Sequence, residues 1–249
     1  MTNYFCFIKL TFKYTKSNMD RFIASHENYS IWQLSKSGLL DLAKFVVLEN
    51  YKHHKKQQVD NSISRGEIRQ VYSEELGFFK HSKIYVARDN RNEIIGAIRV
   101  MEWNRMDELP ITKLFGVTNL KEISPEDSNA HIWHVGRFAV STDLGRCGIM
   151  LFKVLMMYAI SPICKYEKGI MFAECDSKLF KTVNCLGLNA IALNNGMEYL
   201  GSVTIPMYAT RKGMVEFVTR NSKLALHVEK SLNTYSQNSD SGFNQRKSA

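Results

Sequence analysis

The stretch of residues 131–176, HIWHVGRFAVSTDLGRCGIMLFKVLMMYAISPICKYEKGIMFAECD, decides the fold of this chain. Its two ends, HIWHVGRFAV (131–140) and GIMFAECD (169–176), are short apolar runs of strand length, which predicts two strands. The second run is almost continuously apolar, as expected for a central strand. Residues 148–160 lie between the two runs and predict an amphipathic or buried helix. A strand, a crossover helix and a second strand in one sheet make the two strands parallel neighbours.

The flanking sequence predicts further strands and helices on both sides of this unit. The expected elements are strands at 29–34, 83–89, 93–103, 196–211 and 214–218, and helices at 37–55, 67–76 and 179–193. Their order predicts an α/β domain with a mixed, mostly antiparallel sheet, a central parallel strand pair, and helices layered on the sheet.

The composition is that of a globular protein, since 45% of the 249 residues are hydrophobic. We expect one domain at 21–220, an N-terminal extension at 1–20, and a polar, disordered tail at 221–249. Met1 and Met19 both remain open as the natural start. We expect no membrane-spanning helix, because the apolar stretch at 149–163 is too short and is interrupted by charge and proline.

The chain is basic, because 33 Lys and Arg residues outnumber 24 Asp and Glu residues and give a formal charge of +9. Such a charge suits an acidic carrier protein, an anionic membrane surface or coenzyme phosphates, and equally a solvated basic surface. Nucleic acid is not an expected partner, because no nucleic-acid-binding motif accompanies the charge.

The five cysteines show no metal-finger spacing, so we expect no metal site. Their odd number and their mostly apolar surroundings are typical of a reducing, cytoplasmic compartment. Cys175 has no evident His–Asp partners that would activate it as a nucleophile.

Two strands of the predicted sheet carry a resemblance to a known family. The segment WHVGRFAV (133–140) is similar to the W-E-x-S-R-F-x-V strand of acyl-homoserine lactone synthases and of the related N-acyl amino acid synthases. The segment GAIRV (96–100) is similar to their G-x-x-R-L strand, and the likeness extends over residues 84–205. The order of elements resembles the GNAT superfamily of acyltransferases. This implies the GNAT fold, in which two parallel strands splay apart and admit the pantetheine arm of a thioester.

The family's pyrophosphate loop, Q/R-x-x-G-x-G/A, has a degenerate counterpart at 145–150, GRCGIM. The resemblance assigns donor binding to Gly145, Arg146, Gly148 and Ile149, because the backbone N–H groups at a helix N-terminus bind phosphate oxygens. The missing first and last motif residues favour acyl carrier protein, whose phosphopantetheine lacks a pyrophosphate, over acyl-CoA as donor. Neither would be a permanently bound cofactor.

The resemblance implies an enzyme of lipid biosynthesis. Its expected reaction moves a long fatty acyl group from an acyl-carrier-protein or CoA thioester to the amino group of an amino acid or aminolipid. We expect a cytoplasmic location, with contact to a membrane surface. Two alternatives stay open: an acetyl-CoA-dependent N-acetyltransferase of a small amine or protein, and a non-catalytic basic binding protein.

Acyl transfer to an amine requires a base for the attacking nitrogen. His134, which replaces the family glutamate, is the expected base, and Glu102 and Glu174 are reserve candidates. A histidine hydrogen-bonded beside the core is the alternative for His134. Tyr199 and Tyr208 are candidates to protonate the leaving thiolate, or are packed aromatic residues.

Substrate binding is expected from two arginines and from one strand's backbone. Arg99 and Arg137 suit a substrate carboxylate, or else form structural ion pairs. The backbone N–H groups around Phe138 and Val140 would hold the thioester carbonyl. Strict alternation puts His134 and Arg137 on opposite sheet faces, and a bulge near Gly136 would bring both to one face.

Methionines in the C-terminal half leave one further question open. They suit either a long acyl tunnel or ordinary core packing. The residues concerned are Met150, Met156, Met157, Met171, Met197 and Met207.

Overall fold

The computed structural model describes residues 19–54, 61–120, 123, 130–199, 202–224, 228 and 230. The expected N-terminal extension (1–20) and C-terminal tail (221–249) lie almost wholly outside these residues. Both therefore stay predictions.

The described strands form one sheet, in which β5 and β6 are parallel and the other neighbouring strands are antiparallel. In spatial order they are β1 (Arg21–Ser25), β2 (Ser30–Gln33), β3 (Ser82–Arg88), β4 (Ile94–Glu102), β5 (His131–Val140), β6 (Gly169–Asp176), β9 (Ser202–Thr210) and β7 (Ile191–Ala192), with β8 (Met197–Tyr199) also pairing with β9. The predicted α/β class is confirmed. So is the mixed sheet with a central parallel pair.

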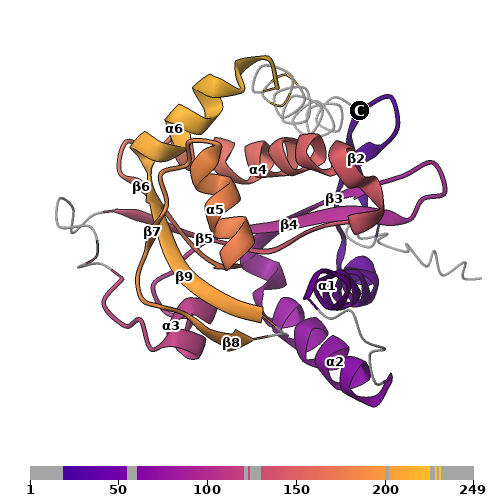
Figure 1. Ribbon diagram of the computed structural model, residues 1–249, viewed down its shortest axis with the longest axis horizontal. Helices are drawn as coiled ribbons and strands as arrows, with labels where there is room; N and C mark the ends of the chain where they lie inside the picture. The colour runs from indigo at the N-terminus through magenta and orange to yellow at the C-terminus, as the bar shows by residue number, and fades with distance from the viewer. Residues whose placement is uncertain are drawn as a thin grey trace, which may run out of the picture.

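Helices cover both faces of this sheet (Figure 1). On one face lie α4 (Gly148–Cys164), α5 (Ser177–Cys185) and α6 (Arg211–Arg220), which share the largest apolar core. On the other face lie α1 (Leu39–His54) and α3 (Pro110–Phe115), each over a smaller apolar cluster. The helix α2 (Asn61–Phe78) packs against α1.

The central helix α4 is apolar on nearly every side because the sheet covers one flank and α6 another. Together with the preceding 3-10 helix η3 (Thr142–Cys147), it makes a helical stretch of 23 residues, Thr142–Cys164. By length and composition alone this stretch is sufficient to cross a membrane, and it is longer than the sequence analysis expects. Because 56% of its most apolar window is buried inside the fold, the buried core helix explains the same composition.

Several elements differ from the sequence-based expectation. The edge strand β1 and the short helix α3 were not predicted, and β7 lies within the stretch 179–193 expected to be a helix. The helix α5 ends at Cys185 rather than at residue 193, because Gly187 adopts a φ of 91°, a left-handed conformation that terminates helices. The expected strand at 214–218 lies within α6, where Met214 and Phe217 are buried three residues apart, at helical spacing.

The irregularity expected near Gly136 is present as a β-bulge. Arg99 of β4 pairs with Gly136, and Ala97 pairs with Ala139, so two residues of β5 stand opposite one residue of β4. Arg137 lies in this bulge with a φ of 52°, which is uncommon for a side-chain-bearing residue. The bulge brings Arg137 to the sheet face that His134 also uses.

The two parallel strands separate where the bulge begins. Pairing between β5 and β6 runs from His131 and Gly169 to Val135 and Ala173 and stops there. Beyond that point β5 stays with β4, and β6 stays with β9. The predicted divergence of the parallel strands beside Gly136 is thus confirmed.

Candidate active site

A cavity of about 100 Å³ opens where β5 and β6 separate. It takes its walls from α1, α2, α3, β4, β5, β6, α5, β8 and β9. Its ionisable lining residues are Glu74, Arg99, Arg137, Glu174, Cys175, Asp176 and Tyr199. Of the residues expected from sequence, Arg99, Arg137, Phe138, Glu174 and Tyr199 line this cavity, whereas His134, Glu102, Val140 and the residues of the loop at 145–150 do not.

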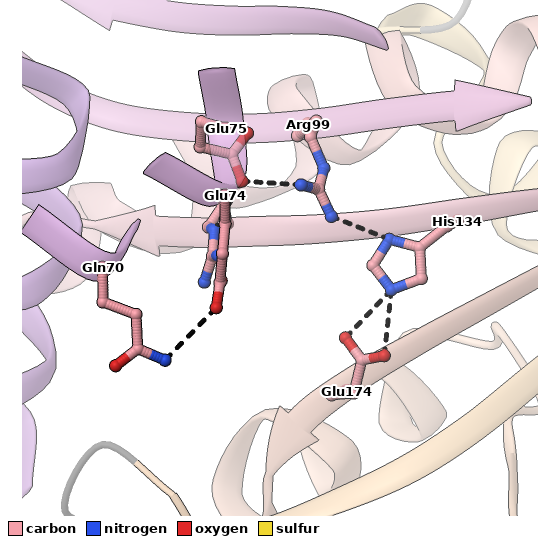
Figure 2. Close-up of polar contacts among 7 residues, drawn as sticks. Gln70, Glu74, Glu75, Arg99, His134 and Glu174 are labelled. Atoms are coloured by element: carbon pink, nitrogen blue, oxygen red, sulfur yellow. Dashed lines mark hydrogen bonds and ion pairs between the residues drawn. The ribbon is translucent and has the colours of Figure 1, made fainter. Parts of the chain in front are cut away.

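Four side chains form a continuous hydrogen-bonded row beside this cavity (Figure 2). Arg99 Nη1 donates to Glu75 Oε1 at 2.6 Å, and Arg99 Nη2 lies 3.0 Å from His134 Nδ1. His134 Nε2 lies 2.9 and 3.0 Å from the two oxygens of Glu174. Because a guanidinium can only donate, His134 Nδ1 must accept, and the ring proton sits on Nε2. The neutral imidazole therefore donates to the Glu174 carboxylate.

This row decides which predicted base reaches the cavity. His134 is fully buried, and both of its ring nitrogens are engaged. Glu174, at the first β6 position past the pairing with β5, lines the cavity, and its side chain is 10% exposed. Glu102 lies elsewhere, half-exposed at the end of β4 beside His131, at 3.1 Å. Of the three candidates, only Glu174 lines the cavity.

Arg137 is held by α2 and does not point free into the cavity. Its Nε donates to Glu75 at 2.7 Å, and its Nη2 forms a short ion pair with Glu74. Burial would lower the pKa of this guanidinium, but Glu75, Tyr199 and Glu74 more than offset it and raise the pKa. The structural ion pair left open for Arg137 in the sequence analysis is present, and likewise Arg99 pairs with Glu75.

The two glutamates of α2 were missed by the sequence analysis, although they organise both arginines. Glu75 is fully buried, and its Oε1 accepts from Arg99 and Arg137 alike. A usable signal existed, because Glu75 follows the apolar residues Val71 and Tyr72 at four- and three-residue spacing. A carboxylate on the apolar face of a helix needs a buried cationic partner.

The two candidate tyrosines have different surroundings. Tyr199 of β8 lines the cavity, and burial raises the pKa of its hydroxyl, with Glu74 and Glu174 adding to the increase and Arg137 opposing it. Tyr208 packs against Phe172, with ring centroids 6.1 Å apart, outside the cavity lining. Of the two tyrosines, only Tyr199 lines the cavity, and its role as a proton donor stays a prediction.

The backbone of β5 past the bulge is oriented as an oxyanion site requires. Ser141 N donates to Ile95 O of β4 at 2.9 Å, so by strand alternation the N–H groups of Phe138 and Val140 point away from β4. They point to the side from which β6 has departed. His53 contacts the carbonyl of Val140 at 3.4 Å, which places the end of α1 over this edge. Carbonyl binding by these two amides stays a prediction.

The expected donor-binding loop lies at the junction of η3 and α4. Gly145 has φ 50° and ψ −124°, a conformation that lets the chain turn into the helix at Gly148. Arg146 and Ile149 are exposed there, and Cys147 makes no side-chain cap. The N-terminus of α4 thus presents its backbone to solvent, and phosphate binding there stays a prediction.

Cys175 is buried against the core, and burial raises the pKa of its thiol, with Asp176 and Glu174 adding to the increase. A thiol with a raised pKa stays protonated at neutral pH and is a poor nucleophile. We therefore expect iodoacetamide at pH 8 to label the exposed Cys147 at least tenfold faster than Cys175, as measured by peptide mass spectrometry. Equal labelling of the two thiols would contradict this assignment.

Two further expectations concern metals and methionines. Among the described residues, no group of three or more potential ligands could hold a metal ion. Met156, Met157, Met171 and Met207 belong to the packed core, whereas Met150 and Met197 are exposed. Core packing therefore accounts for four of the six, and none of the six lines the cavity.

The sequence matches no protein-family model and no curated protein. Solved structures do match. One is an acetyltransferase of the GNAT family from Staphylococcus aureus (TM-score 0.46, 12% identity, 74% of this chain and 99% of that chain). Another is FeeM, an N-acyl amino acid synthase from uncultured soil microbes (TM-score 0.48, 13% identity, covering 77% of this chain and 94% of that chain). A third is the acyl-homoserine lactone synthase LasI (TM-score 0.45, 13% identity, covering 78% of this chain and 95% of that chain). At these identities the likeness concerns the fold alone.

Proposed function

We propose that this protein transfers an acyl group from a pantetheine thioester to the amino group of a small acceptor. The observation that carries the proposal is the gap between β5 and β6 beyond Val135 and Ala173, with Glu174 at its edge. A thioester lying in this gap would meet the backbone of β5 on one side and the Glu174 carboxylate on the other.

The proposed reaction uses residues already placed around the cavity. The Glu174 carboxylate takes a proton from the acceptor nitrogen, which attacks the thioester carbonyl carbon and forms the new C–N bond. The N–H groups of Phe138 and Val140 hold the developing oxyanion. The C–S bond then breaks, and the leaving thiolate takes the hydroxyl proton of Tyr199, which lines the cavity. Glu174 then releases the proton that it took to solvent, and solvent restores the proton of Tyr199.

His134 acts in this scheme as a positioning residue, because it touches Glu174 and not the substrate. Its Nε2–H fixes the carboxylate, and Arg99 fixes the ring in that tautomer. Glutamine retains one donor and one acceptor, whereas leucine retains neither. We therefore expect His134→Leu to lower kcat about tenfold or more and His134→Gln to restore most of the loss, with both proteins folded by circular dichroism. An equal loss in both variants would instead show that the imidazole itself carries the proton.

The finer part of the proposal concerns the acyl donor. The degenerate loop at 145–150 and the WHVGRFAV strand support a fatty acyl group on acyl carrier protein, in a cytoplasmic pathway of lipid biosynthesis with contact to a membrane surface. The cavity volume of about 100 Å³ favours a second candidate, transfer of a short acyl group such as acetyl. Pockets for larger ligands have volumes of roughly 300–1,000 Å³.

A donor panel separates these two candidates. Acetyl, hexanoyl and dodecanoyl groups would be offered as CoA and as carrier-protein thioesters, and the products quantified by mass spectrometry. The first candidate predicts that dodecanoyl carrier protein reacts at least about tenfold faster than acetyl-CoA. A preference for acetyl-CoA would select the second candidate. In cells, the acyl length of new N-acylated amines in lipid extracts of a host that expresses the protein would distinguish the same two candidates.

A further inference from the structure

We infer that the acceptor of the proposed reaction is a primary amine on an extended alkyl body, and that this body lies in a groove between α2 and α3. This assignment rests on the proposed function, because it names the acceptor class of that same cavity. Three observations support it: the groove continues the candidate catalytic cavity, its walls are apolar, and it lies away from the loop expected to bind the donor.

The groove has a volume of about 350 Å³ and lies directly beside the smaller cavity. The two spaces share Glu74 of α2 and Pro110 and Leu114 of α3 as lining residues. Phe78 links them as well, because its ring lines the groove and the guanidinium of Arg99, a cavity residue, lies 5.1 Å from the ring centroid. Small-molecule pockets have volumes of roughly 300–1,000 Å³, a range that the groove reaches and the cavity alone does not.

The walls of the groove are apolar. They consist mainly of Phe78 from α2 and of Pro110 and Leu114 from α3. The helix α3 turns Ile111 and Phe115 into the apolar cluster beneath it, whereas the half-buried Leu114 belongs to none of the apolar clusters of the described residues. Leu114 therefore offers its apolar surface to a ligand in the cavity and the groove, and not to the core.

The charges of the groove do not call for a second charged group on the ligand. Glu108 and Lys113 are exposed, have opposite charges and stand at the rim. Glu74, whose side chain is 19% exposed, already pairs with Arg137. Because exposed charges contribute little to a contact, an uncharged alkyl body suits these walls best.

The position of the groove favours the acceptor over the acyl chain as its occupant. The helix α3 covers the apolar cluster that contains Ile132 and Ile170, at the starts of β5 and β6. The loop expected to bind the donor, residues 145–150, follows the opposite end of β5, beyond Val140. A donor held at that loop would approach Glu174 from one end of the strand and leave the α2–α3 end open to the acceptor.

Gly77 provides a variant that fills the groove. It lines the groove together with Ser73, Glu74 and Phe78, so it lies on the stripe of α2 that faces this space. A Cβ at Gly77 would meet none of the described atoms within 4 Å, and leucine favours a helix more than glycine does, so we expect Gly77→Leu to fold.

The matched control is Gly66→Leu, in the same helix. Gly66 lies eleven residues before Gly77, which places it on the same face of α2 but roughly 16 Å away along the helix axis. It is exposed, lies outside the groove lining, and its Cβ would likewise meet none of the described atoms within 4 Å.

Calorimetric titration without any acyl donor tests the inference, with propylamine, octylamine and alanine as probes. We expect octylamine to bind at least about tenfold more tightly than propylamine. Each fully buried methylene strengthens binding roughly fourfold, so burial of about two of the five additional methylenes is sufficient. Alanine, which has no alkyl body of this length, should bind no more tightly than propylamine.

The variants locate this length preference. Gly77→Leu should reduce the ratio of the octylamine and propylamine affinities to about twofold or less, whereas Gly66→Leu should keep the wild-type ratio. Leu114→Asn makes the opposite wall polar and should lower the same ratio about threefold or more. Circular dichroism verifies that each variant is folded.

Several results would overturn the inference. They are a lack of octylamine binding, equal affinities of the wild type for the two alkylamines, tighter binding of alanine than of octylamine, or an unchanged ratio in Gly77→Leu. If Gly77→Leu instead changed the preference among acetyl, hexanoyl and dodecanoyl donors and kept the alkylamine ratio, the groove would hold the acyl chain, and the acceptor assignment would be wrong.

The proposed acyl transfer fails or stands separately from the groove. Acylation of any amine by a pantetheine thioester would still support it after each of these contrary results. Alkylamine binding with the expected pattern, but no acylation of any amine by any thioester, would overturn the proposed function and leave the groove as an amine-binding site.

Discussion

Replacing Glu174 with glutamine is expected to lower kcat for acyl transfer by roughly 10²–10⁴-fold, the usual contribution of a general base. Glutamine has nearly the same shape and still accepts the hydrogen bond from His134 Nε2, but it cannot take a proton from the acceptor. The fold should therefore persist while the chemical step fails. Initial rates of N-acylated product by mass spectrometry, with circular dichroism as the folding check, measure both effects.

The control for this prediction is Glu102→Gln, which changes a glutamate that the sequence analysis also proposed as a base. Glu102 is 44% exposed and contacts His131, far along β4 from the gap. The acyl-transfer rate of Glu102→Gln should stay within about twofold of the wild-type rate, because surface substitutions usually have small effects. Equal rates for wild type and Glu174→Gln would remove the assigned base.

The largest expected effect on stability comes from Arg99→Ala, which should lower the free energy of unfolding by about 3–5 kcal/mol. Arg99 is 1% exposed and its partner Glu75 is fully buried, so the substitution leaves a buried carboxylate with one cation fewer. It also removes the guanidinium from above the Phe78 ring, 5.1 Å from its centroid. Equilibrium unfolding in urea measures the loss.

An exposed ion pair provides the comparison for the loss of unfolding free energy expected for Arg99→Ala. Lys44 and Asp41 form an ion pair at 3.3 Å on α1, with side chains 51% and 65% exposed. Lys44→Ala should change the free energy of unfolding by no more than about 0.5 kcal/mol, because exposed pairs contribute little. A loss for Arg99→Ala as small as that for Lys44→Ala would contradict the view that the Glu75–Arg99 pair fastens α2 to the sheet.

The sequence predicts the centre of the fold well because the relevant signals are local. The apolar runs at 131–140 and 169–176, with the helix between them, require a parallel pair, and the glycine at 136 marks the bulge. The strand expected at 214–218 is a helix instead, since five apolar-rich residues fit either period until their neighbours are known.

The site was only partly predictable because its chemistry depends on contacts distant in the sequence. Glu75 reaches Arg99 across 24 residues and Arg137 across 62 residues, and no local pattern pairs them. Alternation along β5 predicts the sheet face on which His134 lies. It does not predict that Glu174 of the neighbouring strand lies between His134 and the cavity. The direction of His134 was thus predictable, whereas its buried position behind Glu174 was not.

Thiol release from a pantetheine thioester tests the central assignment most directly. Wild-type protein and Glu174→Gln would be incubated with acetyl- and dodecanoyl-thioesters, with and without octylamine and a panel of other primary amines, and the free pantetheine thiol quantified by mass spectrometry. We predict release that requires an amine, yields the matching amide in equal amount, and falls at least about a hundredfold in the variant. Release that is independent of amine, or equal in both proteins, would contradict acyl transfer at the gap between β5 and β6.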